Sequence, residues 1–132
     1  MLKDKPIEKF DWKDKIILIA EDVETNFLFL EEALRKTEVK IVHAQDGQEA
    51  VDFCKSMEHI DLVLMDIKMP NMNGYEATRQ IKSFRKDLPI VAQTAFAMAG
   101  EKEQILAAGC DDYISKPIKP KDLLALINKY MK

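Results

Sequence analysis

Residues 62–66 read LVLMD, four consecutive apolar residues followed by an aspartate. The run lacks in-and-out alternation, as expected for a strand of a parallel sheet that helices cover on both faces. Similar short apolar runs lie at residues 16–20, 39–44, 90–92 and 113–115. Segments with helical spacing of apolar residues follow each run. Five strands alternating with five helices predict a parallel α/β domain of three layers with right-handed crossovers.

The length and composition of the chain indicate one globular domain. The chain has 132 residues, of which 47% are hydrophobic and 33% are charged, and this excludes disordered and low-complexity classes. Its net charge of −3 disfavours direct nucleic-acid binding, because such proteins are usually basic. The longest apolar runs have about five residues, far too few to cross a membrane. We expect a cytoplasmic domain at residues 15–132, preceded by a linker or N-terminal extension at residues 1–14.

Polar side chains stand at or just after the ends of four predicted strands. They are Glu21 and Asp22 after the first, Asp66 after the third, Thr94 at the fourth and Lys116 after the fifth. In open α/β sheets, ligands bind outside the carboxyl ends of the strands, where the strand order reverses. We therefore expect three carboxylates, a hydroxyl and a lysine to meet at one edge of the sheet.

This set of side chains suits phosphoryl transfer with a metal ion. Crowded carboxylates require a cation, and oxygen ligands without His or Cys favour Mg²⁺. Lys116 and Thr94 suit a phosphoryl group, and a carboxylate beside a metal can itself be the nucleophile. Each residue alone has a simpler interpretation, since the acidic residues and Thr94 can cap helices and Lys116 can lie on the surface. The complete set at successive strand ends favours metal-assisted phosphorylation of an aspartate.

The same residues lie in motifs that resemble the receiver domain of two-component response regulators. The motifs are IILIAED at residues 16–22, VLMDIKMPNMNGYEA at 63–77, PIVAQTAFA at 89–97 and DDYISKPI at 111–118. The likeness is closest to receivers of hybrid histidine kinases, because of the spacing of Asp22 and Asn26 and the run TAFA at residues 94–97. It implies a flavodoxin-like (βα)5 sandwich, in which a five-stranded parallel sheet has the order 2-1-3-4-5.

The resemblance also implies a role for each residue at the predicted edge. Asp66 would accept a phosphoryl group from the phosphohistidine of a histidine kinase or a histidine phosphotransfer domain. Asp22 and Asp66 would bind Mg²⁺ with the backbone carbonyl of Lys68, while Glu21 would hold waters of the metal. Lys116 would contact the phosphoryl group. Such a domain is an enzyme only in catalysing its own phosphorylation and dephosphorylation.

A second group of implied roles concerns signal output. Thr94 and Tyr113 would form a switch pair that changes the surface of the fourth helix, fifth strand and fifth helix, where the domain could also dimerise. Pro117 resembles the cis proline that follows the lysine in this family. Asn73-Gly74 reads as a turn in which Gly74 has positive φ.

The first helix predicts a docking surface for the phosphodonor. Residues 27–30 read FLFL, and a helix cannot bury four successive side chains on one face. The core stripe is predicted to contain Val23, Phe27, Leu30 and Leu34. Asn26, Phe29 and Ala33 form a neighbouring stripe that begins beside Asp22, and the resemblance favours this stripe as the docking site. The alternative is that Phe29 folds over an adjacent helix.

Two other classes share parts of this pattern. A phosphotransferase of the haloacid-dehalogenase type needs a second aspartate two residues after the nucleophile, and Lys68 occupies that position. A flavodoxin-like electron carrier needs a phosphate-binding loop rich in Ser and Thr after the first strand. The chain has EDVE at residues 21–24 there, which would repel a phosphate.

Overall fold

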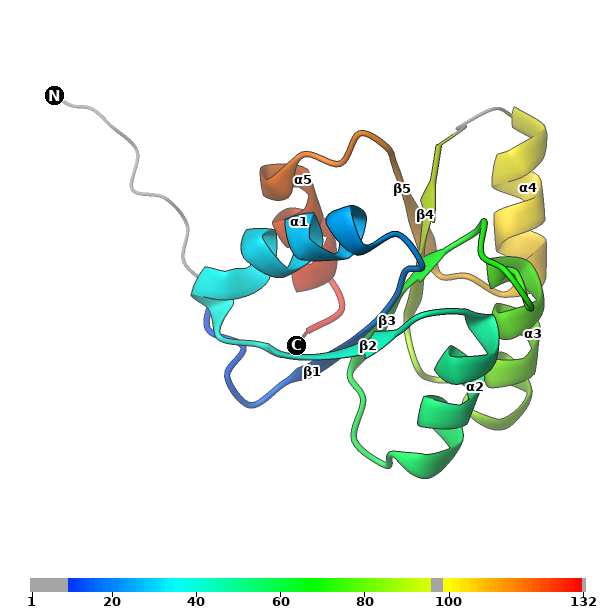
Figure 1. Cartoon of the computed structure of the whole chain (residues 1–132), viewed down its shortest axis with the longest axis horizontal. Helices are drawn as coiled ribbons and strands as arrows, with labels where there is room; N and C mark the ends of the chain where they lie inside the picture. Colours follow the sequence, from blue (N-terminus) through cyan, green and yellow to red (C-terminus); the bar gives the residue numbers. More distant parts are fainter. Residues whose placement is uncertain (1–9, 96–98, 132) are drawn as a thin grey trace, which may run out of the picture.

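The computed structural model describes residues 10–95 and 99–131 as one α/β domain (Figure 1). Residues 1–9 of the expected linker, and Phe96 and Ala97 of the TAFA run, lie outside the described residues. The strands are β1 (Ile16–Ala20), β2 (Lys40–Ala44), β3 (Leu62–Asp66), β4 (Ile90–Thr94) and β5 (Asp112–Ser115). The helices are α1 (Glu24–Leu34), the 3₁₀ helix η1 (Arg35–Thr37), α2 (Gly47–Ser56), α3 (Gly74–Phe84), α4 (Ala99–Ala108) and α5 (Pro120–Asn128).

The five strands form one parallel sheet in the order β2-β1-β3-β4-β5. Helices α1 and α5 cover one face of this sheet, and α2, α3 and α4 cover the other (Figure 1). Every residue of β3 and β4 is buried, because both faces of these central strands pack against helices. The predicted flavodoxin-like fold is confirmed.

Local signals set most helix ends, with one correction. The Asp46 carboxylate accepts a hydrogen bond from the Glu49 N–H at 2.8 Å and caps α2, Gly109 closes α4 at φ 108°, and Pro120 opens α5. The prediction that Gly74 is a turn residue with positive φ is wrong. Asn73 is the N-cap of α3 and Gly74 is its first residue. A Cβ at Gly74 would collide with the backbone carbonyl of Asp66, so close approach requires glycine there.

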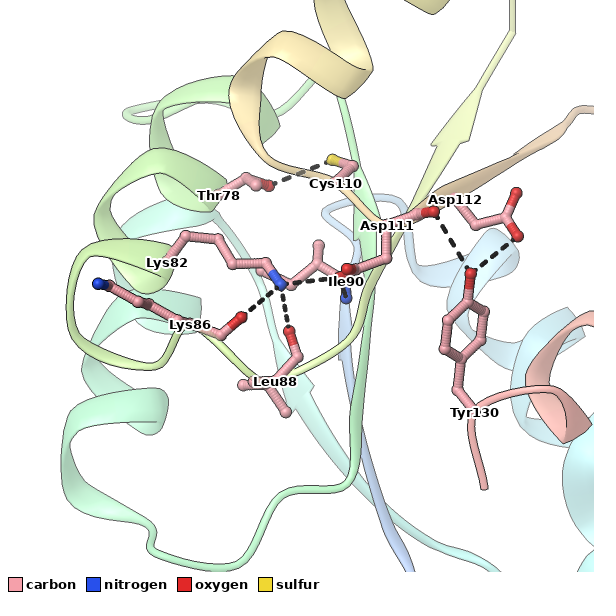
Figure 2. Close-up of polar contacts among 9 residues, drawn as sticks. All are labelled: Thr78, Lys82, Lys86, Leu88, Ile90, Cys110, Asp111, Asp112 and Tyr130. Atoms are coloured by element: carbon pink, nitrogen blue, oxygen red, sulfur yellow. Dashed lines mark hydrogen bonds and ion pairs between the residues drawn. The ribbon is translucent and has the colours of Figure 1, made fainter. Parts of the chain in front are cut away.

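The start of β5 is tied to helices in both layers (Figure 2). Asp111, directly before the strand, accepts hydrogen bonds from Lys82 Nζ of α3 and from the Ile90 N–H, both at 2.8 Å. Asp112 accepts a hydrogen bond at 3.0 Å from the hydroxyl of Tyr130, which lies just after α5. These contacts fix the end of β5 that lies far from the predicted site.

Candidate functional site

The carboxyl ends of β1, β3, β4 and β5 meet at one edge of the sheet, as the sequence predicted. Asp22, Asp66, Thr94 and Lys116 line a single cavity of about 200 Å³. Glu21 is fully buried, and carboxylate oxygens of Glu21, Asp22 and Asp66 lie within 4.8 Å of one another. The side chains that the strand-end rule selected are therefore together, and we call this cavity the cleft.

The electrostatics of the cleft favour a bound cation. Burial, and then the charge of Asp66, raise the pKa of Glu21 to about 7 from 4.5. Glu21 Oε2 accepts a hydrogen bond from the Val23 N–H at 3.2 Å, whereas its buried Oε1 has no hydrogen-bond partner among the described residues. A buried carboxylate oxygen without a partner is costly. Three oxygen ligands and this unsatisfied atom fit a hard divalent ion such as Mg²⁺.

Lys116 supplies the positive charge of the cleft. Its Nζ lies 3.2 Å from Asp66 Oδ1 and 3.9 Å from Glu21 Oε1. The lysine follows β5 directly, and the Lys116–Pro117 peptide is cis, as the sequence resemblance implied. Lys68, after β3, also lines the cleft. An ammonium group beside Asp66 can neutralise an anionic group delivered to that carboxylate.

The predicted switch residues lie on neighbouring strands. Ala92 pairs with Tyr113 and Thr94 with Ser115 in the β4–β5 ladder, so Thr94 lies one side-chain position nearer the cleft than Tyr113 on the same face of the sheet. Thr94 is buried at the wall of the cleft. Tyr113 is half-buried, and Lys102 Nζ of α4 lies 5.8 Å from the centroid of its ring.

The predicted docking stripe on α1 is adjacent to the cleft. Phe29 is 45% exposed and lines two apolar cavities. Asn26 and Lys116 line both the first of these cavities and the cleft, and Ala33 lines the second. The prediction that Val23 belongs to the core is wrong, since it is 44% exposed and precedes α1 as its N-cap.

Two further cleft residues did not follow from the sequence argument. Gln93, 1% exposed on β4, has a buried Nε2 without a hydrogen-bond partner in the described chain. The sequence signal that could have identified it is the presence of a glutamine inside the otherwise apolar run of β4. Glu101, in the first turn of α4, has a buried Oε1 that likewise lacks a partner among the described residues. Its place depends on how α4 packs, which no local pattern reveals.

Comparison with known proteins identifies this arrangement. The family model described as "Response regulator receiver domain" matches residues 17–128. The chain belongs to this family. It is therefore a receiver domain of two-component signalling, and the four strand ends that meet at the cleft lie within the matched range.

The receiver domain is similar to parts of two hybrid kinases of Dictyostelium discoideum. It is 41% identical over 120 residues to hybrid signal transduction histidine kinase I, and 44% identical over 135 residues to kinase G. These alignments cover 85% and 98% of this chain but only 7% and 4% of the kinases. It is also 35% identical over 119 residues to the polar-differentiation response regulator DivK of Brucella ovis, covering 89% of this chain and 96% of DivK.

Solved structures agree with these sequence relatives. The receiver domain of a sensor histidine kinase from Pseudomonas aeruginosa superposes with a TM-score of 0.82 at 34% identity, covering 89% of this chain and 97% of that one. That crystal structure has a magnesium ion coordinated in its active site cleft. A histidine kinase receiver from Syntrophus aciditrophicus gives 0.81 at 30% identity, covering 89% of each chain. No helix in the described part of our receiver domain combines the length and apolar character that crossing a membrane requires.

Proposed function

We propose that Asp66 is the phosphoacceptor of this receiver domain, and that it takes the phosphoryl group from a phosphohistidine of a histidine kinase or a histidine phosphotransfer domain. One observation carries the proposal. Asp66 is the last residue of the buried strand β3 and lines the cleft. Its carboxylate lies 3.2 Å from the ammonium group of Lys116. A carboxylate held beside a fixed cation can act as a nucleophile toward an anionic phosphoryl group.

The transfer exchanges one bond to phosphorus for another. A carboxylate oxygen of Asp66 attacks the phosphorus, the P–N bond to the imidazole breaks, and its electron pair returns to the nitrogen. The product is an acyl phosphate on Asp66. Lys116 neutralises charge on the phosphoryl oxygens, and the buried Thr94 hydroxyl lies at the wall of the cleft to contact them.

The carboxylates of the cleft would hold Mg²⁺. Asp22, Asp66 and the backbone carbonyl of Lys68 would be its ligands, and Glu21 would hold its waters. The cluster of carboxylate oxygens within 4.8 Å, and a Glu21 Oε1 that accepts no hydrogen bond from the described residues, support this assignment. When bound, Mg²⁺ supplies positive charge that lets the carboxylates and the phosphoryl oxygens occupy one site.

The output of phosphorylation would be a change in the surface of α4, β5 and α5. Thr94 would move toward the phosphoryl oxygens, and Tyr113 would enter the space that it leaves. The exposed Leu106 on α4 lines a surface cavity with Tyr113 and Leu126, which supports a partner or dimer contact on this same face.

The phosphodonor would dock on the stripe of Asn26, Phe29 and Ala33. The apolar cavities beside Phe29 suit an amphipathic helix that presents its phosphohistidine toward the cleft. Asn26 lines both the docking cavity and the cleft, so the two surfaces are continuous.

Intact mass spectrometry tests the phosphoacceptor. With acetyl phosphate and Mg²⁺, the protein should gain the mass of one phosphoryl group, and EDTA should prevent the gain. Asp66→Asn should abolish it because the amide is a poor nucleophile. Asp87→Asn, at an exposed aspartate outside the cleft, is the control and should be labelled like the wild type. Labelling of Asp66→Asn at the wild-type rate would overturn the assignment.

A further inference from the structure

His43, at the end of β2, contacts the backbone of the cleft. Its Nε2 lies 2.8 Å from the backbone carbonyl oxygen of Glu21. Its ring stacks on Phe27 of α1, with centroids 3.7 Å apart and an interplanar angle of 8°. The ring is therefore held in one orientation by α1 while its edge points at the residue that follows β1.

The Glu21 carbonyl is part of the peptide group that joins Glu21 to Asp22. The other backbone group of Glu21, its N–H, donates to the Ala44 carbonyl at 3.0 Å. Strand β2 ends at Ala44, so the backbone hydrogen bonds between β1 and β2 stop there. The His43 imidazole therefore supplies the donor for the Glu21 carbonyl. A buried carbonyl needs such a donor, and Glu21 is fully buried.

The plane of this peptide group controls where the carboxylate of Asp22 points. Rotating the plane changes ψ of Glu21 and φ of Asp22 together, because the peptide bond is rigid. Both residues belong to the carboxylate cluster. A donor that fixes the carbonyl direction therefore fixes the relative placement of two acidic side chains without touching either carboxylate.

We propose that His43 is a positioning residue for the metal-binding carboxylates, acting through its hydrogen bond to the Glu21 carbonyl. The inference rests on the proposed Mg²⁺ site. Removing a residue that orients metal ligands by hydrogen bonding commonly weakens metal affinity by about 10–100-fold. The competing interpretation is that His43 only packs against Phe27.

Two variants separate the hydrogen bond from the packing. His43→Phe keeps an aromatic ring against Phe27 and removes the donor, whereas His43→Gln keeps an amide donor and removes the ring. Mg²⁺ affinity is measured by calorimetry, and the melting temperature of the metal-free protein is measured alongside. We expect His43→Phe to weaken Mg²⁺ binding on the order of tenfold. His43→Gln should bind Mg²⁺ close to the wild type even where its melting temperature falls.

A kinetic readout gives a second check. The rate of labelling by acetyl phosphate should be slow for His43→Phe at low Mg²⁺ and should return to the wild-type rate at saturating Mg²⁺. Wild-type Mg²⁺ affinity in His43→Phe would overturn the inference, as would weakened binding in both variants that follows their loss of stability. Failure of the wild type itself to bind Mg²⁺ would instead overturn the proposed site, and the inference with it.

Discussion

At the scale of single residues, Glu21 shows how the site is built at the expense of stability. Its side chain is fully buried beside Asp66, and these surroundings favour its neutral form. Without a metal ion, ionising Glu21 places two carboxylates beside the single ammonium group of Lys116. Repulsion between these carboxylates should therefore lower the stability of the metal-free domain at neutral pH.

This repulsion predicts a pH-dependent effect of Glu21→Gln on stability. The pKa of Glu21 is about 7 in the folded protein and 4.5 ordinarily, so between these pH values the folded state holds a proton that the unfolded state has lost. Stability of the metal-free wild type should thus fall as pH rises from about 4.5 to 7. Glu21→Gln removes this fall and should be more stable than the wild type at pH 8, by roughly 1–3 kcal/mol.

Urea unfolding without metal at pH 5 and pH 8 measures the effect. The stabilisation should be large at pH 8 and small at pH 5. Glu31→Gln, at an exposed position of α1, should change neither value. A Glu21→Gln protein with the same pH dependence as the wild type would show that Glu21 ionises normally.

At the scale of elements, the end of β5 that is far from the cleft is anchored to both helical layers (Figure 2). Lys82 Nζ donates to the carbonyls of Lys86 at 3.1 Å and Leu88 at 2.8 Å as well as to Asp111. Its side chain is 16% exposed, so little water can replace these bonds. Lys129 Nζ pairs with Asp112 at 3.1 Å, but its side chain is 62% exposed.

The two lysines predict different losses on substitution by methionine. Lys82→Met keeps the aliphatic stem and removes the lysine's hydrogen bonds to two carbonyls and to the Asp111 carboxylate, which keeps only the Ile90 N–H as a donor, and this should cost about 2–3 kcal/mol of unfolding free energy. Lys129→Met breaks an ion pair whose lysine is largely exposed, and a contact of its ammonium group with the Tyr130 ring at 5.8 Å, and should cost at most about 1 kcal/mol. Chemical denaturation of both variants gives the comparison. Equal losses would mean that the Lys82 contacts contribute no more than a surface ion pair.

Helix α1 carries two exposed apolar side chains that allow a matched test of docking. Phe29 lines the cavities beside the cleft, whereas Leu28, 49% exposed, is not among their lining residues. Phe29→Ala should slow phosphotransfer from the histidine protein by about tenfold or more, as expected for an aromatic anchor. It should leave acetyl phosphate labelling and melting temperature nearly unchanged.

Leu28→Ala is the control and should leave both reactions at the wild-type rate. Loss of labelling with both donors in Phe29→Ala, or a large fall in its melting temperature, would show that Phe29 supports the fold. Equal slowing by the two variants with the histidine donor would place the docking surface elsewhere on α1.

At the scale of the whole molecule, the sequence predicted the fold well because its signals were local. Apolar runs placed the strands, and the strand-end rule brought Asp66, Lys116 and their neighbours to one edge. One error arose where distant backbone segments meet, and the other at the start of a helix. Gly74 is required by the carbonyl of Asp66 and not by a turn, and Val23 ends outside the core because α1 starts one residue after it. The contact of His43 with Glu21 depends in the same way on the placement of β2.

Strand β5 has an anchored end and a second end at the cleft, where the proposed phosphorylation would act. Tyr113 lies between these ends, half-buried beneath Lys102 of α4. If the domain is a two-state switch, beryllofluoride bound at Asp66 should draw Thr94 toward the cleft and let the Tyr113 ring move inward. The ring would then leave the Lys102 ammonium group, and α4 would lose a contact with β5.

Tyrosine-labelled NMR can follow this change, because the chain has three tyrosines in different places. Beryllofluoride with Mg²⁺ should shift the ring signals of Tyr113 strongly, while Tyr130, held by Asp112 at the anchored end of β5, should stay in place. Thr94→Ala should still bind beryllofluoride but should uncouple the Tyr113 shift from it. Equal shifts of Tyr113 and Tyr130 would indicate a movement of the whole of β5, and an unmoved Tyr113 would exclude it as the switch residue.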